Sequence, residues 1–154
     1  MAAGTTISRG SLFVTSQIIR RYASAVTLAT GDLVNVQNGA LQIADAGERI
    51  AGQILESATS ATTDAQVNIT PGLVVVMDND NVSATFSATS VGEYFDIAGA
   101  TGAQVIDTSS TVAPETTSNS AQMVCLEFNP QGVGFDDDLS IGTFMIKEHQ
   151  YFGF

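Results

Sequence analysis

The chain alternates between short apolar runs and clusters of glycine and small polar residues. This pattern is typical of β-strands joined by turns, because strands in globular proteins are usually about five or six residues long. No amphipathic helix of about ten residues stands out, so the strand and helix alternation of nucleotide-binding α/β proteins is missing. The pattern predicts an all-β fold, with a small β-barrel or β-sandwich body.

The clearest local prediction is a hairpin at Asn38-Gly39. These two residues separate the strand-like runs Leu33–Gln37 and Ala40–Ala44. Both central positions of a type I′ turn need a positive φ, which asparagine and glycine tolerate. Pro71-Gly72 is a second turn signal, of the kind found at the centre of a type II turn.

Further strands are expected where turn residues enclose an apolar run. They are Ile50–Leu55, Val67–Ile69, Leu73–Met77, Val82–Ala88, Glu93–Ala98, Ala103–Asp107, Ala121–Phe128 and Leu139–Glu148. The run Leu73–Met77 is apolar throughout, which predicts a strand covered on both faces, either in the core or beneath a neighbouring subunit. The hydroxyl-rich segment Thr108–Ser120 is expected to be a loop.

The first 26 residues differ from the rest because they show no sustained period. Their only charges are Arg9, Arg20 and Arg21, whereas residues 28 to 154 hold all 16 acidic residues and two bases. This asymmetry favours a segment that docks on another molecule, and a solvated terminus is the alternative. We predict an extended N-terminal arm over residues 1–26 and a single β domain over residues 27–154. The arm residues expected to dock are Arg9, Leu12, Phe13, Ile18, Ile19, Arg20, Arg21 and Tyr22.

The composition supports the β prediction and limits the partners. Of 154 residues, 44% are hydrophobic and only 14% are charged, while 17 threonines and 14 serines supply much of the polar surface. Threonine is β-branched and suits strands, and serine suits turns. The net charge of −11 disfavours nucleic acid as a partner, because binding phosphates requires lysine and arginine.

Cys125 is the only cysteine, so no disulfide forms within the chain. Its neighbours Val124 and Leu126 predict a thiol in the core or the sheet. The longest apolar runs are too short to cross a membrane. Arg20 and Arg21 stand where a signal peptide would need its apolar region. We therefore expect no membrane partner and synthesis in the cytoplasm.

Candidate catalytic chemistry is sparse. His149 is the only histidine, and the chain has no Gly-x-Ser-x-Gly turn, phosphate-binding loop or dinucleotide fingerprint. Asp78 and Asp80 resemble the opening of a calcium loop, but Val82 stands at the third ligand position. The adjacent carboxylates of Asp136–Asp138 point to opposite faces of an extended backbone and are expected to be solvated. The sequence predicts no catalytic residue, no metal site and no cofactor.

One local resemblance to an enzyme family concerns Gly102–Asp107. This segment resembles the uracil-binding strand of the trimeric, all-β dUTP pyrophosphatases. Thr108 follows it, where that family has a base-stacking tyrosine, and the other motifs and the arginine tail of the family are missing. We interpret this resemblance as accidental.

A longer resemblance covers roughly residues 28 to 77. The residues that carry it are Gly31-Asp32-Leu33-Val34, Asn38-Gly39, Ile43-Ala44-Asp45-Ala46-Gly47, Ile50-Ala51-Gly52-Gln53-Ile54 and Val67-Asn68-Ile69-Thr70-Pro71-Gly72-Leu73. This order of a Gly-Asp strand entry, a hairpin, an Ala-Gly … Gly strand and a strand ending at a glycine turn resembles the head decoration, or cement, proteins of tailed bacteriophages. Short β motifs of this composition also recur in unrelated proteins.

The resemblance implies a structural protein of the virion and not an enzyme. Members of that family have a small barrel-like body, are usually trimeric, and bind the outer surface of the mature head, where they brace neighbouring capsid subunits. It therefore implies a homotrimer, the major capsid protein as partner, and the capsid surface as location. On this interpretation we expect the arm, residues 1–26, to fix the protein to the shell. The alternatives are another virion β module, associated with the tail or a fibre, and a small trimeric hydrolase.

Overall fold

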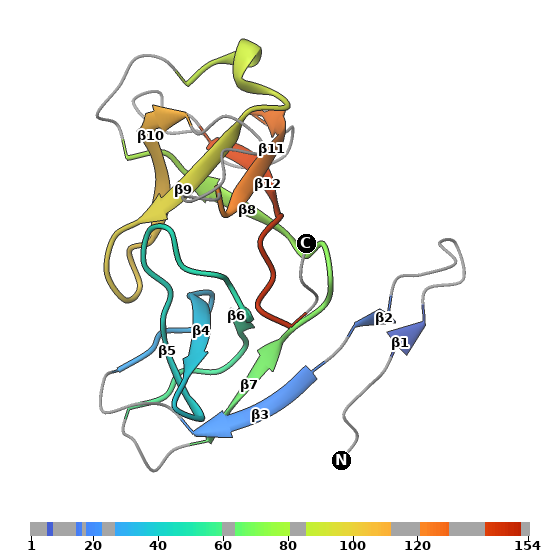
Figure 1. Ribbon diagram of the computed structural model, residues 1–154, viewed down its shortest axis with the longest axis vertical. Helices are drawn as coiled ribbons and strands as arrows, with labels where there is room; N and C mark the ends of the chain where they lie inside the picture. Colours follow the sequence, from blue (N-terminus) through green and yellow to red (C-terminus); the bar gives the residue numbers. More distant parts are fainter. Residues whose placement is uncertain are drawn as a thin grey trace.

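The computed structural model describes residues 27–59, 64–80, 86–108, 121–129 and 141–151, and the backbone of strand residues 6–7, 15–16, 18–22 and 109–111. Two five-stranded antiparallel sheets make up the body and lie one above the other along its long axis (Figure 1). The lower sheet has the order β3 (Ile18–Tyr22), β7 (Asp64–Asn68), β6 (Gly52–Ile54), β4 (Leu33–Gln37) and β5 (Ala40–Ile43). The upper sheet has the order β10 (Val105–Thr111), β9 (Tyr94–Ala98), β11 (Met123–Phe128), β12 (Ile141–Ile146) and β8 (Val74–Asp78). The all-β prediction is confirmed.

Aliphatic side chains fill the core of the lower sheet. Leu41, Ile54 and Val67 have no exposed surface. Fully burying a side chain of this size contributes about 1.5–3 kcal/mol. The hairpin that brings Leu41 into this core forms as predicted, because Asn38 and Gly39 have φ values of 51° and 80°.

Aromatic side chains fill the core of the upper sheet. The rings of Phe86 and Phe95 meet edge to face, with centroids 5.8 Å apart, and those of Phe95 and Phe144 do so at 6.0 Å. This arrangement suits the ring quadrupoles. Cys125 is buried in the same core, as its apolar neighbours predicted.

Strand β4 connects the two cores because its side chains alternate in direction. Leu33 packs in the upper core, whereas the next residue, Val34, packs in the lower core. Successive side chains of a strand point to opposite faces. The first residues of β4 therefore lie between the two sheets and contact both of them.

Glutamine side chains form hydrogen bonds to backbone groups across the joint between the sheets. Gln104 Oε1 accepts from the Leu33 N–H at 2.6 Å. Its Nε2 donates to the carbonyls of Leu33 and Ala44, both at 3.0 Å. Gln150 likewise accepts from the Val36 N–H at 2.8 Å and donates to its carbonyl at 2.7 Å. A side-chain amide has both a donor and an acceptor, so it can form hydrogen bonds with the backbone N–H and C=O groups of a strand, as a neighbouring strand would.

Gln122 is the third such residue and is completely buried. Its Oε1 accepts from the Ile97 N–H at 3.0 Å. Its Nε2 donates to the carbonyl of Asp45 at 2.8 Å and to that of Glu48. The side chain therefore ties β9 of the upper sheet to the loop between β5 and β6 of the lower sheet.

The prediction of a strand over Val82–Ala88 is wrong at the end of that range. Residues 81–85 lie outside the described residues, and the chain then enters a 3₁₀ helix, η1 (Ala88–Ser90). Ser87 Oγ accepts from the Thr89 N–H, and Ser90 Oγ accepts from the Ser87 N–H. Short hydroxyl side chains that bond nearby backbone groups compete with strand pairing in this way.

The prediction of a loop over Thr108–Ser120 is wrong at the start of that range. Strand β10 continues to Thr111, and residues 112–120 lie outside the described residues. Thr108 Oγ1 donates to Asp80 Oδ1 at 2.6 Å. This contact satisfies a hydroxyl in a buried position, so the hydroxyl-rich sequence extends the strand here.

Strand β8 is buried on one face only. Val75 is 7% exposed, whereas Val74 and Val76 are 48% and 49% exposed. Of the two kinds of cover predicted for the run Leu73–Met77, burial of both faces in the core is not found among the described residues, because β8 is an outer strand of its sheet and its second face is exposed there. Cover by a neighbouring subunit stays a prediction.

Replacing Gln122 by leucine is expected to weaken the joint between the sheets. The Ile97 N–H and two carbonyls would lose their partner, and each buried polar group left unpaired costs about 1–3 kcal/mol. We expect Gln122→Leu to lower the free energy of unfolding in urea by about 3 kcal/mol or more. The matched control is Gln42→Leu, because the Gln42 side chain makes no hydrogen bond to the described residues; its change should stay within about 0.5 kcal/mol. Equal losses in the two variants would contradict this role.

Gly52 is expected to tolerate no side chain. A Cβ on this residue of β6 would lie 2.1 Å from the carbonyl oxygen of Asn68 on the neighbouring strand. Because a backbone atom in a sheet cannot move aside, we expect Gly52→Ala to cost about 3 kcal/mol or to prevent folding. Gly47→Ala is the control, since Gly47 has a positive φ but open space, and should cost about 1–2 kcal/mol. Thermal unfolding followed by circular dichroism compares them, and a Gly52→Ala protein as stable as wild type would refute the close approach.

Candidate functional site

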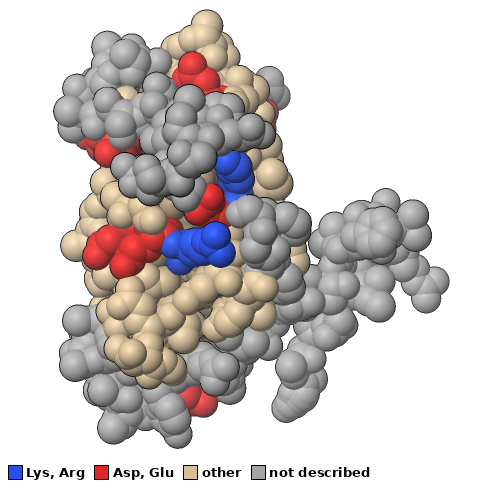
Figure 2. All heavy atoms as spheres, viewed as in Figure 1, with Lys and Arg blue, Asp and Glu red and all other residues tan. Residues whose placement is uncertain are grey.

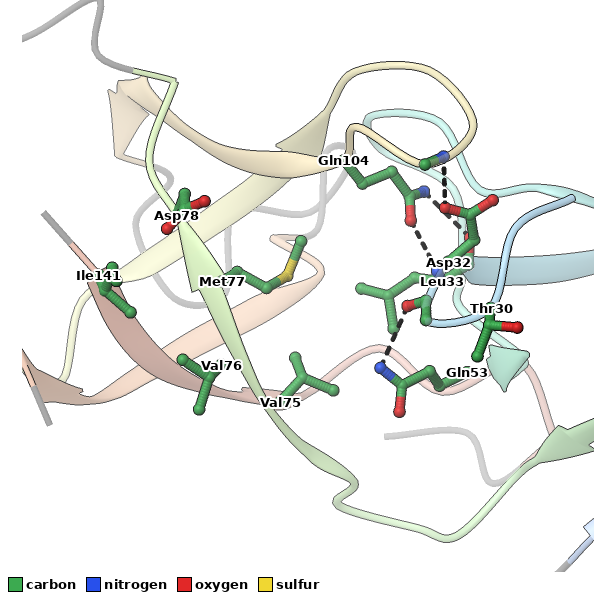
Figure 3. A pocket seen from close by; sticks show the side chains of 12 residues that line it. Thr30, Asp32, Leu33, Gln53, Val75, Val76, Met77, Asp78, Gln104 and Ile141 are labelled. Atoms are coloured by element: carbon green, nitrogen blue, oxygen red, sulfur yellow. Dashed lines mark hydrogen bonds between the residues drawn. The ribbon is translucent and has the colours of Figure 1, made fainter. Parts of the chain in front are cut away.

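A cavity of about 350 Å³ lies beside β8 where the two sheets meet (Figure 3). One wall is Val75–Asp78 of β8. The opposite wall is the segment Thr30–Leu33 together with Gly102 and Gln104, and Gln53 lines the cavity as well. In Figure 3 the Val75 and Met77 side chains point from β8 toward the opposite wall. We call this cavity the β8 groove.

Asp32 holds the wall opposite β8 in place. The residue is 3% exposed, and both of its carboxylate oxygens accept backbone hydrogen bonds. Oδ1 accepts from the Gly102 N–H at 2.7 Å, and Oδ2 accepts from the Ala29 N–H at 2.8 Å. Hydrogen bonds to a charged acceptor are stronger than neutral ones. The Gly-Asp pair that the sequence singled out therefore shapes one side of the groove.

The backbone of β8 has an open side that faces the groove. Strand β8 pairs with β12 along Val74–Asp78, and the carbonyl of Leu73 accepts from the Ile146 N–H at 2.9 Å. In an antiparallel pair, alternate residues direct their backbone groups to opposite sides. The N–H and C=O groups of Val74 and Val76 therefore point away from β12.

A row of apolar side chains crosses the outer face of the upper sheet. Val74 is paired with Met145, Met145 with Val124, and Val124 with Tyr94. All four are partly or largely exposed, while their neighbours along each strand point into the core. Lys147 Nζ lies 4.5 Å from the centroid of the Tyr94 ring at the end of the row. We call these four residues the outer apolar row.

The body is strongly acidic, because negative charges far outnumber positive ones. Arg49 and Lys147 are the only bases after residue 27. Figure 2 shows basic side chains near the middle of the face in view, with acidic ones beside them. Asp32 and Asp78 line the β8 groove, and no base does. The groove therefore favours a neutral or basic occupant and disfavours a phosphate or another acid.

Two buried titratable groups, and one that is partly buried, serve the fold. His149 is fully buried, its Nδ1 accepts from the Tyr151 N–H at 3.1 Å, and burial lowers its pKa. Burial raises the pKa of Asp96, against the effect of backbone hydrogen bonds. Burial also raises the pKa of the Cys125 thiol to about 11. Neither the His149 ring nor the Cys125 thiol reaches solvent, so neither meets a substrate in this conformation.

The structure gives no sign of a cation site or a membrane span in its described parts. No three acidic, histidine or cysteine side chains gather there in a way that could hold a metal ion. Asp80, from the calcium-loop comparison, accepts from Thr108, and Asp136–Asp138 lie outside the described residues. No helix among the described residues has the length and apolar character needed to cross a membrane.

The residues predicted to dock fall into two groups. Arg9, Leu12 and Phe13 lie outside the described residues. Ile18, Ile19, Arg20, Arg21 and Tyr22 form β3, whose backbone pairs with β7 from Ile18 opposite Asn68 to Tyr22 opposite Asp64. The lower sheet therefore begins at Ile18, inside the range predicted for the arm. Strands β1 (Thr6–Ile7) and β2 (Thr15–Ser16) pair with each other in a separate two-stranded sheet.

The β8 groove and the outer apolar row were not predicted as sites. The unbroken run Leu73–Met77 was the available signal, since it demanded a cover for both faces. The wall opposite β8 is formed by residues that are far from β8 in the sequence, so no local sequence pattern predicts the groove. Comparison of the chain with models of protein families, with curated proteins and with solved structures finds no match.

The buried His149 should make stability depend on pH. Its pKa is lowered in the folded state, whereas an unfolded histidine titrates near pH 6.5. As the pH falls below about 6.5, the unfolded chain gains a proton that the folded chain does not, so the free energy of unfolding should fall. Urea denaturation at several pH values between about 5 and 7.5 measures this.

The matched protein for this measurement is His149→Gln. It should be less stable at neutral pH but lack this pH dependence. The raised pKa of Asp96 acts with the opposite sign and is present in both proteins, so their difference isolates His149. The same slope in wild type and variant would rule the histidine out as its source.

Proposed function

We propose that this protein is a structural module that binds the outer surface of a tailed-phage head and stabilises contacts between major capsid subunits. The observation that carries the proposal is the outer apolar row, an exposed apolar surface on an antiparallel sheet with a packed aromatic core behind it. Soluble monomers rarely leave such surface uncovered unless it contacts a partner.

The resemblance over residues 28 to 77 supports the same proposal. Those residues supply β4, β5, β6 and β7, the Gly-Asp wall of the β8 groove, and the start of β8. The resemblance and the exposed strand therefore meet in one region of the fold. Under this proposal the protein acts as a homotrimer on the virion surface, after synthesis in the host cytoplasm, with the major capsid protein as its partner.

Binding through contact area explains the chemistry of the body. A stable protein interface buries about 1,200–2,000 Å², so several partly exposed apolar side chains on a fixed surface contribute more than any single polar group. The acidic surface adds little affinity, because exposed ion pairs are worth only about 0–1 kcal/mol. Apolar contacts dominate this kind of attachment.

A head-binding assay tests the proposal. Purified protein is mixed with undecorated heads of the phage that encodes it, and the bound fraction is measured after sedimentation. Replacing Val74 and Val124 by serine removes apolar area from the outer apolar row, and we expect at least about tenfold weaker binding. The control replaces Val91 and Leu55 by serine, because both are exposed apolar residues outside the row. We expect that protein to bind as wild type does.

Two results would count against the proposal. Wild-type protein that leaves the heads undecorated would remove the function itself. Equal binding by the row variant and the control would keep a head-binding function but exclude the outer apolar row as its surface.

A further inference from the structure

The upper sheet is curled but closes at one end only. Its outer strands β8 and β10 meet at a bridge between Asn79 and Ile106, where the Asp80 N–H donates to the Ile106 carbonyl at 3.0 Å. Toward the start of β8 no further bridge joins the two strands among the described residues. The β8 groove lies in this gap, between β8 and the wall that Gln104 and Leu33 form.

The open side of β8 is suited to pairing with another strand. Val74 and Val76 direct their donors and acceptors away from β12, and β8 carries no lysine, proline or bulge. These are the devices by which natural proteins protect an outer strand from another chain. An unprotected apolar outer strand is therefore a site for an added strand.

The walls of the β8 groove limit the size of a segment that can pair with β8. A strand that pairs with β8 lies about 4.8 Å from it, on the side where the Thr30–Leu33 wall also stands. A single extended segment needs less room beside β8 than the edge of a whole sheet from another protein, which would meet the Thr30–Leu33 wall. The occupant is thus one extended stretch of polypeptide.

The N-terminal segment of this chain, residues 1–17, has the matching chemistry. Arg9 is its only charged residue, and it includes the apolar run Leu12-Phe13-Val14. Asp32 and Asp78 in the groove provide the complementary charge. Residues 1–17 can extend up to about 55 Å, which is enough to reach a neighbouring subunit.

Within this segment the structure describes the strands β1 and β2. They pair with each other and stand to the side of the body in Figure 1. An isolated two-stranded ladder is only marginally stable in water. We propose that residues 1–17 of one copy insert as an added strand in the β8 groove of a second copy, and that this exchange joins the copies of the homo-oligomer.

Disulfide trapping between two different copies tests the proposal in the absence of heads. In a Cys125→Ala background, a Val76→Cys protein is mixed with a tagged protein that carries Ser8→Cys, Ser11→Cys or Ser16→Cys, and the mixture is mildly oxidised. We expect a cross-link between the two proteins for at least one of these positions, with a yield about tenfold or more above that of a Val91→Cys control. Val91 is as exposed as Val76 but does not line the groove.

A second pair of proteins tests the same contact without cysteines. Deleting residues 2–16 should reduce the mass measured by light scattering to that of one chain. Val76→Pro should do the same while the circular dichroism spectrum stays unchanged, because it removes an N–H that faces the groove and leaves the pairing with β12 intact.

The proposal fails if no position cross-links to Val76→Cys, if the links form equally with Val91→Cys, or if they form only within one chain. It also fails if the deleted protein keeps the mass of the full chain. These outcomes are independent of the head-binding function: heads decorated without cross-linking would refute strand exchange alone, and cross-linking without decoration would refute head binding alone.

Discussion

Side-chain amides that replace missing strand neighbours hold the two sheets of this protein together. The first residues of β4 lie between the sheets, where the Leu33 carbonyl accepts from the Ala44 N–H but the Leu33 N–H is paired by a side chain. Gln104 supplies a donor and an acceptor to Leu33, and Gln150 does the same for Val36. Gln122 joins β9 to the loop after β5. Because a buried backbone group without a partner is costly, the position of one sheet on the other depends on these three amides.

The groove and the C-terminal segment both depend on that joint. Gln104 and Asp32 fix the wall opposite β8, so the gap in the upper sheet has a defined width. After β12, the Ile50 N–H donates to the Glu148 carbonyl and the Gln150 N–H donates to the Ile50 carbonyl. These bonds bury His149 between the sheets, which is why its pKa falls. The same contacts thus underlie the expected pH dependence of stability and the shape of the candidate site.

Features set by adjacent residues could be predicted from the sequence, whereas features set by distant ones could not. The Asn38-Gly39 turn follows from its own backbone preference, and β4 has the predicted bounds. The end of the Val82–Ala88 prediction failed because Ser87 forms a local cap. The outer strand position of β8 depends on β12, and the bonds of Gln104 to Leu33 span 71 residues. The unbroken apolar run at 73–77 signalled that β8 needed cover, but it did not identify the groove beside the strand.

The body is an all-β fold whose exposed apolar strand β8 offers two sides to partners. One side is the outer face, proposed to lie against a phage head, and the other is the backbone of β8, proposed to receive the N-terminal segment of another copy. Cryo-electron microscopy of undecorated tailed-phage heads, incubated with the purified protein, tests the first proposal most directly. We expect density at regular, symmetry-related positions on the outer surface, with the upper sheet turned toward the shell. Bare heads, or density on the tail alone, would contradict it.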